Sequence, residues 1–227
     1  MENTGKAMVA EFVSTFALIF IGAGAVIANA NGDLDLTGVA LAHGLVLAIM
    51  VSITAHLSGG VVNPAVAIGL WVTGKLDTVR TGAYIVAELL GAVAGAYLLK
   101  FLLPAAQFGA GGAVALAPDL VTGKGILIEA VATFFLMFAV FGTAVDDRGP
   151  FNKTAGLTIG LVIAFDIMAF GPWTGAAMNP ARWFGPALAT GNWDDWWVWI
   201  VGPVAGAIVA SVTYWGVFLR DKEPATP

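Results

Sequence analysis

Two short stretches of the chain share one pattern of side chains, Ser58–Val66 (Ser-Gly-Gly-Val-Val-Asn-Pro-Ala-Val) and Thr174–Arg182 (Thr-Gly-Ala-Ala-Met-Asn-Pro-Ala-Arg). Each contains Asn-Pro-Ala after a small-residue turn, and each precedes an apolar run that is too short to cross a bilayer. A segment that enters an apolar medium without crossing it must hide its unpaired backbone in protein or against a water-filled cavity. The two stretches therefore predict two half-helices whose ends meet at a pore.

The residue types in each Asn-Pro-Ala unit suit the start of a helix. Asparagine is a favoured N-cap, and proline is favoured at the first helical position because it has no N–H to leave unpaired. One copy is weak evidence, since soluble helices begin in the same way, but two copies at equivalent places in an apolar chain are strong evidence. If each half-helix holds its own asparagine oxygen, the NH₂ groups of Asn63 and Asn179 face the lumen as donors. Two facing N-termini also concentrate about half a positive charge each at one point, which repels cations and hydronium.

The composition indicates a membrane protein with several spans, because 59% of the residues are hydrophobic and 11% are charged. No run of like charges suggests nucleic acid as a partner, the chain contains no cysteine, and no pattern indicates a cofactor or metal. Six segments are long and apolar enough to span a bilayer: 8–28, 36–57, 80–103, 125–145, 155–173 and 195–219.

The basic residues predict the orientation of these spans. With the N-terminus inside, seven Lys and Arg residues lie in the cytoplasm and two lie outside, in agreement with the positive-inside rule. Both termini are then cytoplasmic, and the sequence leaves a plasma membrane and a vacuolar-type membrane open. The seven are Lys6, Lys75, Arg80, Arg148, Lys153, Arg220 and Lys222, and the two are Lys100 and Lys124.

An internal duplication accounts for the whole chain. Glu11–Phe20 and Glu129–Phe138 are identical at six of ten positions with an offset of 118, and the two Asn-Pro-Ala units lie 116 residues apart. Each half has three spans, so the second half must be inverted relative to the first, which places a functional site near the bilayer midplane. We expect one all-α channel domain over 1–227, with six transmembrane helices and two re-entrant half-helices. Inverted repeats 1–103 and 125–219 are joined by an external loop, 104–124.

These features together resemble the aquaporins, the major intrinsic protein family, over essentially the whole chain. The resemblance implies a right-handed bundle of six tilted helices, a tetramer with one pore in each chain, and passive conduction of water and small neutral solutes across the lipid bilayer without enzymatic activity. It also implies the site residues. Asn63, Pro64, Ala65, Asn179, Pro180 and Ala181 would form the pore centre, and the carbonyls of Gly59, Gly60, Val61, Gly175, Ala176 and Ala177 would guide water.

By the same resemblance, a narrow selectivity filter lies outward of the asparagines. The four family positions correspond to His43, Ile167, Ala176 and Arg182. Water-selective members usually carry Phe and His at the first two of these positions, whereas this chain carries His and Ile. The set is similar to that of the plant tonoplast intrinsic proteins and other ammonia-permeable aquaporins. It implies a slightly wider ring and ammonia as a second permeant.

The choice between water and glycerol rests on the residues around the second motif. Glycerol channels carry Asp directly after the arginine and a basic residue four positions later, whereas this chain has Trp183 and Ala187. The segment Gly171-Pro-Trp-Thr-Gly175, in contrast, is close to the corresponding sequence of glycerol facilitators. Water is the expected principal permeant, with a glycerol or small-solute facilitator as the alternative.

The remaining polar residues have structural as well as functional interpretations. Glu11 and Glu129 are expected to brace the half-helices, although proton relay is the alternative. His56, near the inner mouth, is either an interfacial polar residue or a proton-sensitive gate. Asp166 is expected to pair within the bundle or between subunits, and the tryptophans of 193–199 to form an aromatic belt.

Two rival classes are less consistent with the sequence. A coupled transporter needs an ion site, and the sequence offers no paired carboxylates at the midplane to hold one. A structural junction protein with a vestigial pore would fit the short external loops, but the intact motifs give no reason for a closed pore.

Overall fold

The computed structural model describes residues 4–149 and 152–220, and these residues form helices joined by short loops, without a strand. The long helices in chain order are α1 (Thr4–Ala30), α2 (Leu36–Ser58), α4 (Thr78–Leu102), α6 (Thr122–Val140), α7 (Ala155–Thr174) and α9 (Val198–Tyr214). The shorter elements are α3 (Pro64–Val72), α5 (Ala105–Phe108), α8 (Pro180–Thr190), the π-helical turns η1 (Phe141–Val145) and η3 (Trp215–Leu219), and the 3₁₀ turn η2 (Asn152–Thr154).

The fold class and the six predicted spans are confirmed. Six helices are long and apolar enough to cross a membrane, counting η1 with α6 and η3 with α9. The predicted ends differ from the observed ones by a few residues, and capping side chains mark the starts of two of the helices. Asp35 accepts a hydrogen bond from the backbone N–H of Gly38 and starts α2, and Asp77 does the same for Arg80 and α4. Lys222 lies outside the described residues.

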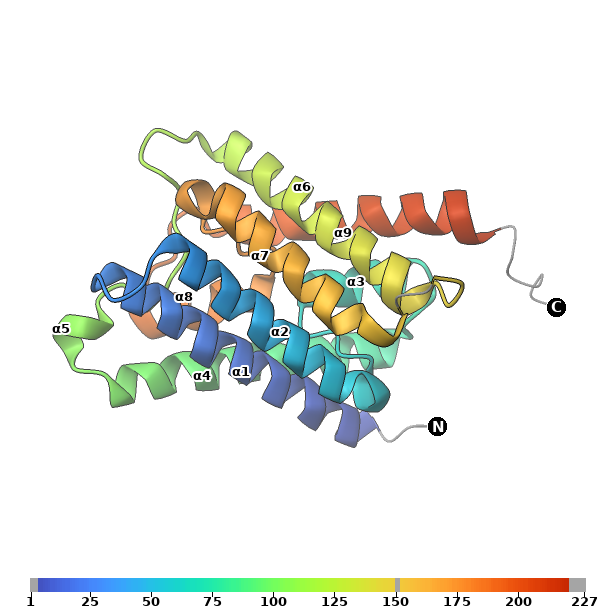
Figure 1. The fold of residues 1–227 in the computed structure, drawn as a ribbon, viewed down its shortest axis with the longest axis horizontal. Coiled ribbons are helices and arrows are strands. Elements are labelled where there is room, and N and C mark those ends of the chain that lie inside the picture. Colours follow the sequence, from blue (N-terminus) through green and yellow to red (C-terminus); the bar gives the residue numbers. More distant parts are fainter. Residues whose placement is uncertain (1–3, 150–151, 221–227) are drawn as a thin grey trace.

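The long helices form a bundle around the two short helices α3 and α8 (Figure 1). α1 packs against α2 and α4, α6 against α7 and α9, and α2 against α7. Small residues allow this close packing, since a Cβ atom on Gly95 would lie 2.9 Å from the carbonyl oxygen of Phe16 and one on Gly202 would lie 2.7 Å from Cβ of Glu129. Many large apolar side chains on the outside of the bundle are exposed, as expected for a surface in contact with lipid.

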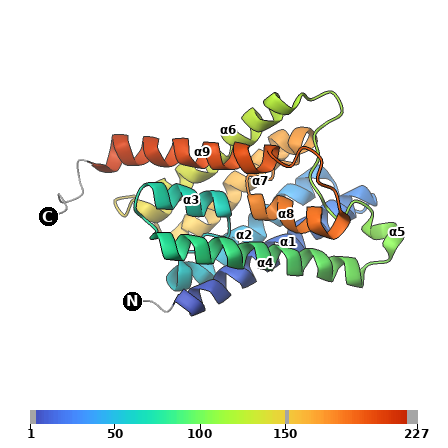
Figure 2. The ribbon, with the colours of Figure 1, turned by 180° about the vertical axis from the view of Figure 1, so that it is seen from behind.

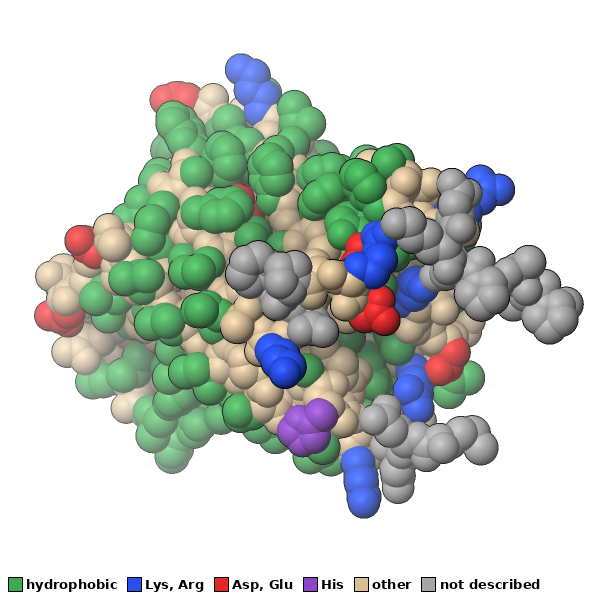
Figure 3. Space-filling model, turned by 45° about the vertical axis from the view of Figure 1, so that its right-hand side comes forward, with side chains coloured by type: hydrophobic (Ala, Val, Ile, Leu, Met, Phe, Trp, Pro, Cys, Tyr) green, Lys and Arg blue, Asp and Glu red, His purple; other side chains and the backbone are tan. Residues whose placement is uncertain are grey.

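The bundle has two distinct ends. α1 begins and the last helix of the chain ends at one end of the bundle, here called the terminal face, whereas α5 and the loop after α4 lie at the other, the far face (Figure 1). Seen from behind, α3 occupies the terminal half and α8 the far half, between α4 and α9 (Figure 2). Lys and Arg side chains gather toward the terminal face (Figure 3).

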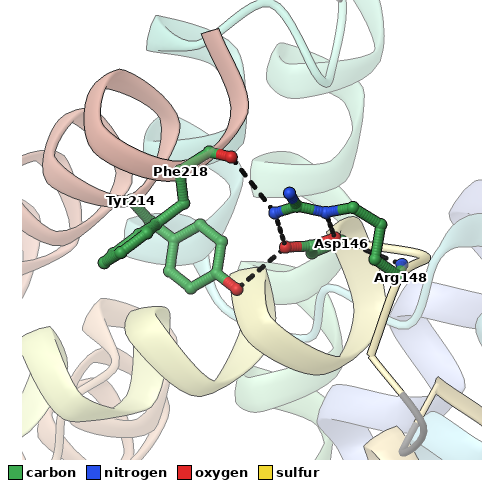
Figure 4. Close-up of polar contacts among 4 residues, drawn as sticks. All are labelled: Asp146, Arg148, Tyr214 and Phe218. Atoms are coloured by element: carbon green, nitrogen blue, oxygen red, sulfur yellow. Dashed lines mark hydrogen bonds and ion pairs between the residues drawn. The ribbon is translucent and has the colours of Figure 1, made fainter. Parts of the chain in front are cut away.

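A polar cluster joins the ends of α6 and α9 at the terminal face (Figure 4). The guanidinium of Arg148 makes an ion pair with the buried carboxylate of Asp146 and donates a hydrogen bond to the carbonyl oxygen of Phe218 in η3, 3.1 Å away. The hydroxyl of Tyr214 donates to Asp146 Oδ2 over 3.1 Å. The cluster therefore ties the loop after η1 to the last turn of the chain that the structure describes.

Candidate functional site

The two Asn-Pro-Ala units form the N-termini of α3 and α8. Asn63 and Asn179 have extended backbones, and each is followed by proline at the start of its helix. Oδ1 of Asn63 accepts a hydrogen bond from the N–H of Ala65 at 2.9 Å. Oδ1 of Asn179 accepts from Ala181 at 2.9 Å and from Arg182 at 3.3 Å. Each asparagine oxygen is thus held by its own helix, so that its NH₂ group points away from that helix.

The asparagine NH₂ groups also cross-link the two halves of the chain. Nδ2 of Asn63 donates to the carbonyl oxygen of Met178 at 2.8 Å, and Nδ2 of Asn179 donates to that of Val62 at 2.9 Å. An amide NH₂ carries two hydrogens, so each asparagine retains one donor. Because both residues line the same cavity, described below, the second hydrogen is available to a molecule inside it.

The backbone before each asparagine has an unusual conformation that one glutamate holds in place. Val62 and Met178 have φ values of 56° and 53°. These lie in the left-handed region, which residues other than glycine rarely adopt and which is least favourable for a β-branched residue such as valine. Glu11 accepts hydrogen bonds from the N–H groups of Val61 and Val62 at 2.9 and 2.6 Å. In this conformation the N–H of Val62 donates to Glu11, and its carbonyl oxygen accepts a hydrogen bond from Asn179.

Glu129 plays the same part in the second half. Its two carboxylate oxygens accept from the N–H groups of Ala177 at 3.0 Å and Met178 at 2.7 Å, and the hydroxyl of Thr174 donates to it at 2.7 Å. Glu11 and Glu129 are both fully buried, and buried carboxylates of this kind require such donors. Both glutamates therefore hold the turns that precede α3 and α8.

Three adjoining hollows, which share wall residues, lie in a row along the bundle. The central one shares Ile167 and Arg182 with a hollow toward the far face, and Val61, Leu70 and Val140 with one toward the terminal face. Gly175 lines the hollow at the far face. The central hollow is lined by nearly all the residues predicted for the pore: Asn63, Asn179, Gly59, Gly60, Val61, Ala177, His43, Ile167, Ala176 and Arg182. Pro64, Ala65, Pro180 and Ala181 are buried behind it, at the starts of their helices.

The four positions predicted for the filter lie on the wall of this central cavity, and two of them are hydrogen-bonded to each other. Nε of Arg182 donates to Nε2 of His43 over 3.1 Å, and Nδ1 of His43 lies 2.9 Å from the carbonyl oxygen of Val39. A carbonyl oxygen only accepts, so Nδ1 carries the hydrogen and His43 is the neutral tautomer. Both ring nitrogens are thereby hydrogen-bonded within the protein, although the residue lines the cavity.

Arg182 is fixed at a second point by the loop at the far face. Its Nη1 atom donates to the carbonyl oxygen of Gly112 at 2.9 Å, and the residue is 3% exposed. A guanidinium has five N–H donors, so donors remain for a molecule in the cavity after these bonds. Arg182 is therefore a buried, oriented cation on the path, close to the start of α8.

Three residues that support the site were missed by the sequence analysis. Glu88 in α4 is fully buried and accepts from the N–H of Asn63 at 2.9 Å. Tyr84 donates its hydroxyl to the carbonyl of Ser58 at 2.9 Å, and Trp199 donates its indole N–H to the carbonyl of Thr174 at 3.0 Å. The signal for Glu88 was present in the sequence, since a lone carboxylate within an apolar span is rarely without a role.

The prediction of an aromatic belt over residues 193–199 is wrong for Trp199. That residue is 1% exposed, because its indole bonds the end of α7, whereas Trp193, Trp196 and Trp197 are 40–46% exposed. Asp166 is buried, and its Oδ2 atom has no hydrogen-bond partner in the described part of the chain. His56 is exposed near the end of α2. Among residues 4–149 and 152–220, no group of three His, Asp or Glu side chains could hold a metal ion.

Comparisons with known proteins show the family of the chain and support its fold. The chain is 43% identical to aquaporin TIP4-4 of Zea mays, covering 95% of this chain and 88% of that protein. It is 37% identical to aquaporin-4 of Mus musculus, covering 96% of this chain and 69% of that protein. The X-ray structure of the aquaglyceroporin from Plasmodium falciparum superposes with a TM-score of 0.85 at 26% identity, covering 96% of this chain and 97% of that one. The family model for the major intrinsic proteins matches residues 2–214, and the chain belongs to that family.

Proposed function

We propose that this chain is a passive water channel of a membrane and that it excludes ions and protons. The observation that carries the proposal is the row of three adjoining hollows, with Asn63, Asn179 and Arg182 on the wall of the central one. The asparagines and the arginine offer donors, whereas most of the other lining side chains are apolar. A water molecule can give its oxygen to these donors without being held tightly, which suits rapid passage.

Exclusion of protons follows from the orientation that these donors impose. Water that accepts hydrogen bonds from Asn63 and Asn179 cannot also accept one from the next water in the file, so a proton wire is interrupted there. The N-termini of α3 and α8 meet at the same place, and their partial positive charges oppose cations. Arg182 adds a full positive charge closer to the far face.

Several parts of the proposal concern arrangement in the membrane. The excess of Lys and Arg at the terminal face supports a cytoplasmic location for both termini. The matched hydrogen bonds of Glu11 and Glu129 support two inverted repeats, 1–103 and 125–219, in one channel domain. Exposed apolar side chains on the outer helices are consistent with lipid contact and with assembly into a homotetramer.

Ammonia is a second candidate permeant, on the evidence of the filter. Ile167 is apolar where water-selective members usually carry His, and both ring nitrogens of His43 are hydrogen-bonded within the protein. Apolar groups on the wall penalise a neutral solute less than they penalise an ion, because the ion loses more hydration, and the positive charge of Arg182 opposes a cation further. We therefore expect uncharged ammonia to pass and ammonium to be excluded.

The test is stopped-flow light scattering on proteoliposomes with water, ammonia, urea and glycerol. The proposal requires faster osmotic shrinkage than in empty vesicles, a low activation energy and no proton current. Shrinkage equal to that of empty vesicles would contradict it, and glycerol permeation comparable to that of water would favour a glycerol facilitator. Saturable uptake driven by an ion gradient would instead indicate a coupled transporter.

A further inference from the structure

The filter pair His43 and Arg182 rests on a helix that contributes no residue to the ring. Gly22 of α1 lies against the imidazole of His43. His43 lines the central cavity and Gly22 does not, so Gly22 is on the side of the ring away from the cavity. A Cβ atom built on Gly22 would lie 2.5 Å from Nε2 and 2.6 Å from Cδ2 of His43. Real Cβ contacts are not this short, so any other residue at position 22 would move the ring.

The atom that a methyl group at position 22 would displace is the one that binds the arginine. Nε2 of His43 accepts the hydrogen bond from Nε of Arg182. Nδ1 is tied to the carbonyl of Val39, one turn earlier on the same helix. The ring is therefore held between the α2 backbone, the guanidinium and the bare backbone of Gly22, and its free direction is toward the cavity.

The next residue of α1 supports the second acceptor of Arg182. Gly112 packs directly on Ala23, since a Cβ atom on Gly112 would lie 2.6 Å from the carbonyl oxygen and 2.7 Å from Cβ of Ala23. Gly112 also has a φ of 69°, which favours glycine. Its carbonyl oxygen accepts from Nη1 of Arg182. Two consecutive residues of α1 thus position both groups that orient the filter arginine.

We propose that Gly22 and Ala23 of α1 are positioning residues of the selectivity filter, and that the absence of a side chain at Gly22 sets how far the His43 ring stands back from the pore. The inference rests on the proposed function, because it concerns the width of the conducting ring. Placing a methyl group at position 22 pushes the ring into the cavity and weakens its bond to Arg182. Water conduction then falls, because pore diameter controls passage at such a constriction.

The test compares Gly22→Ala with Gly24→Ala in proteoliposomes. Gly24 lies two residues further along the same helix, where a Cβ atom would meet Cδ2 of Leu99 at 3.5 Å, an ordinary contact. We expect Gly24→Ala to conduct like the unmodified protein and Gly22→Ala to lose at least about threefold in water permeability. Equal conduction by both variants would overturn the inference, while failure of the unmodified protein to conduct would overturn the proposed function instead.

A double-mutant cycle separates positioning of the ring from general packing of α1. In a His43→Ala background the ring is gone, so adding Gly22→Ala should change water permeability by less than about 1.5-fold. A further loss as large as that of Gly22→Ala alone would contradict the proposal. If Gly22→Ala does not fold, the double variant decides. A folded Gly22→Ala/His43→Ala protein supports a clash with the ring, and an unfolded one shows that the glycine serves helix packing.

Discussion

The filter ring has a counterpart in the other half of the chain, and the two rings differ in chemistry. Each filter residue has a partner 116 positions away, and all eight side chains or backbones line the central cavity. The filter has His43, Ile167, Ala176 and Arg182, and the counterpart has Ile159, Val51, Gly60 and Val66. The same geometry therefore carries a histidine and a cation on one side and only apolar groups or glycine on the other. Polar selection is concentrated on the side of α8.

The turns that position these rings differ less than the rings do. Glu11 and Glu129 both hold two consecutive N–H groups, and Asn63 and Asn179 bond each other's turns in a reciprocal way. Backbone geometry at the centre of the pore leaves little freedom, because an unpaired buried N–H is costly. The side chains that face the path are not under this constraint, so the two halves can differ there.

The largest expected effect comes from removing the carboxylate of one turn. Glu129→Ala leaves the N–H groups of Ala177 and Met178 buried without an acceptor, at a cost of about 1–3 kcal/mol each. We expect little folded protein, measured as the monodisperse fraction and unfolding temperature in detergent. Glu11→Ala should cost less, because Glu88 still holds the neighbouring N–H of Asn63.

The control for this comparison is Glu129→Gln, which keeps one acceptor oxygen, so its stability should fall between that of the unmodified protein and that of Glu129→Ala. Equal losses for Glu11→Ala and Glu129→Ala would show that Glu88 does not support the first turn.

The next effect converts the filter toward its apolar counterpart. Arg182→Val places in the filter the residue found at position 66, and it removes the cation that Gly112 and His43 orient. We expect urea or glycerol permeability to rise at least about tenfold and a proton leak to appear, since both charge and bulk are lost from the constriction. Stopped-flow scattering and a pH-sensitive dye measure the two changes.

Val66→Ala is the matched change on the other side, and it should leave proton exclusion intact. An unchanged permeability spectrum for Arg182→Val would remove Arg182 from the filter.

A smaller effect is expected from His43→Ile, which makes position 43 like Ile159. The substitution removes the acceptor of Arg182 Nε but leaves the bond from Nη1 to Gly112. The arginine stays on the wall with more freedom, so we expect a change of roughly two- to fivefold in the ratio of ammonia to water permeability and continued exclusion of protons. A proton leak as large as that of Arg182→Val would show that His43, and not Gly112, fixes the arginine.

The sequence predicted the parts of this site that depend on local pattern. The spans follow from apolar length, and the starts of α3 and α8 from the capping preferences of asparagine and proline. The pairing of Glu11 with Glu129 follows from the repeated sequence. The structure also brings His43, Ile167, Ala176 and Arg182 to one cavity, as the family resemblance implied.

The parts that could not be predicted depend on backbone conformation far along the chain. The bond from Asn63 to the carbonyl of Met178 requires a positive φ at a methionine, which no local rule anticipates. The carbonyl oxygen of Gly112, which accepts from Arg182, lies in a loop rich in small residues. Any carbonyl of that loop could have been the acceptor as far as the sequence shows. The buried Trp199 is indistinguishable in sequence from its exposed neighbours until its bond to Thr174 is seen.

The smallest effect concerns how each half ties together the ends of its first and third spans. In the first half, Asn31, just after α1, donates a neutral hydrogen bond to the carbonyl of Gln107 in α5, the short helix that follows α4. In the second half the tie is the ion pair of Asp146 and Arg148, which reaches Phe218 (Figure 4). The hydrogen bond from Arg148 holds the pKa of Asp146 well below its usual range, although burial opposes this shift.

A carboxyl with a lowered pKa stabilises the folded state at pH values above its unfolded pKa of about 3.9, and this contribution is lost as the pH falls further. Asp146→Asn should therefore lower the unfolding temperature in detergent slightly, and equally at all pH values between about 5 and 8. The difference between the two proteins should shrink below about pH 4, where Asp146 takes up a proton in the unfolded chain of the unmodified protein while the folded protein does so only at lower pH. Asn31→Ala is the matched change in the first half, and its effect should not vary with pH, since no charge is involved. If Asp146→Asn lost stability only near neutral pH, a group other than Asp146 would be titrating, and the ion pair would not be what ties η3 to the loop after η1.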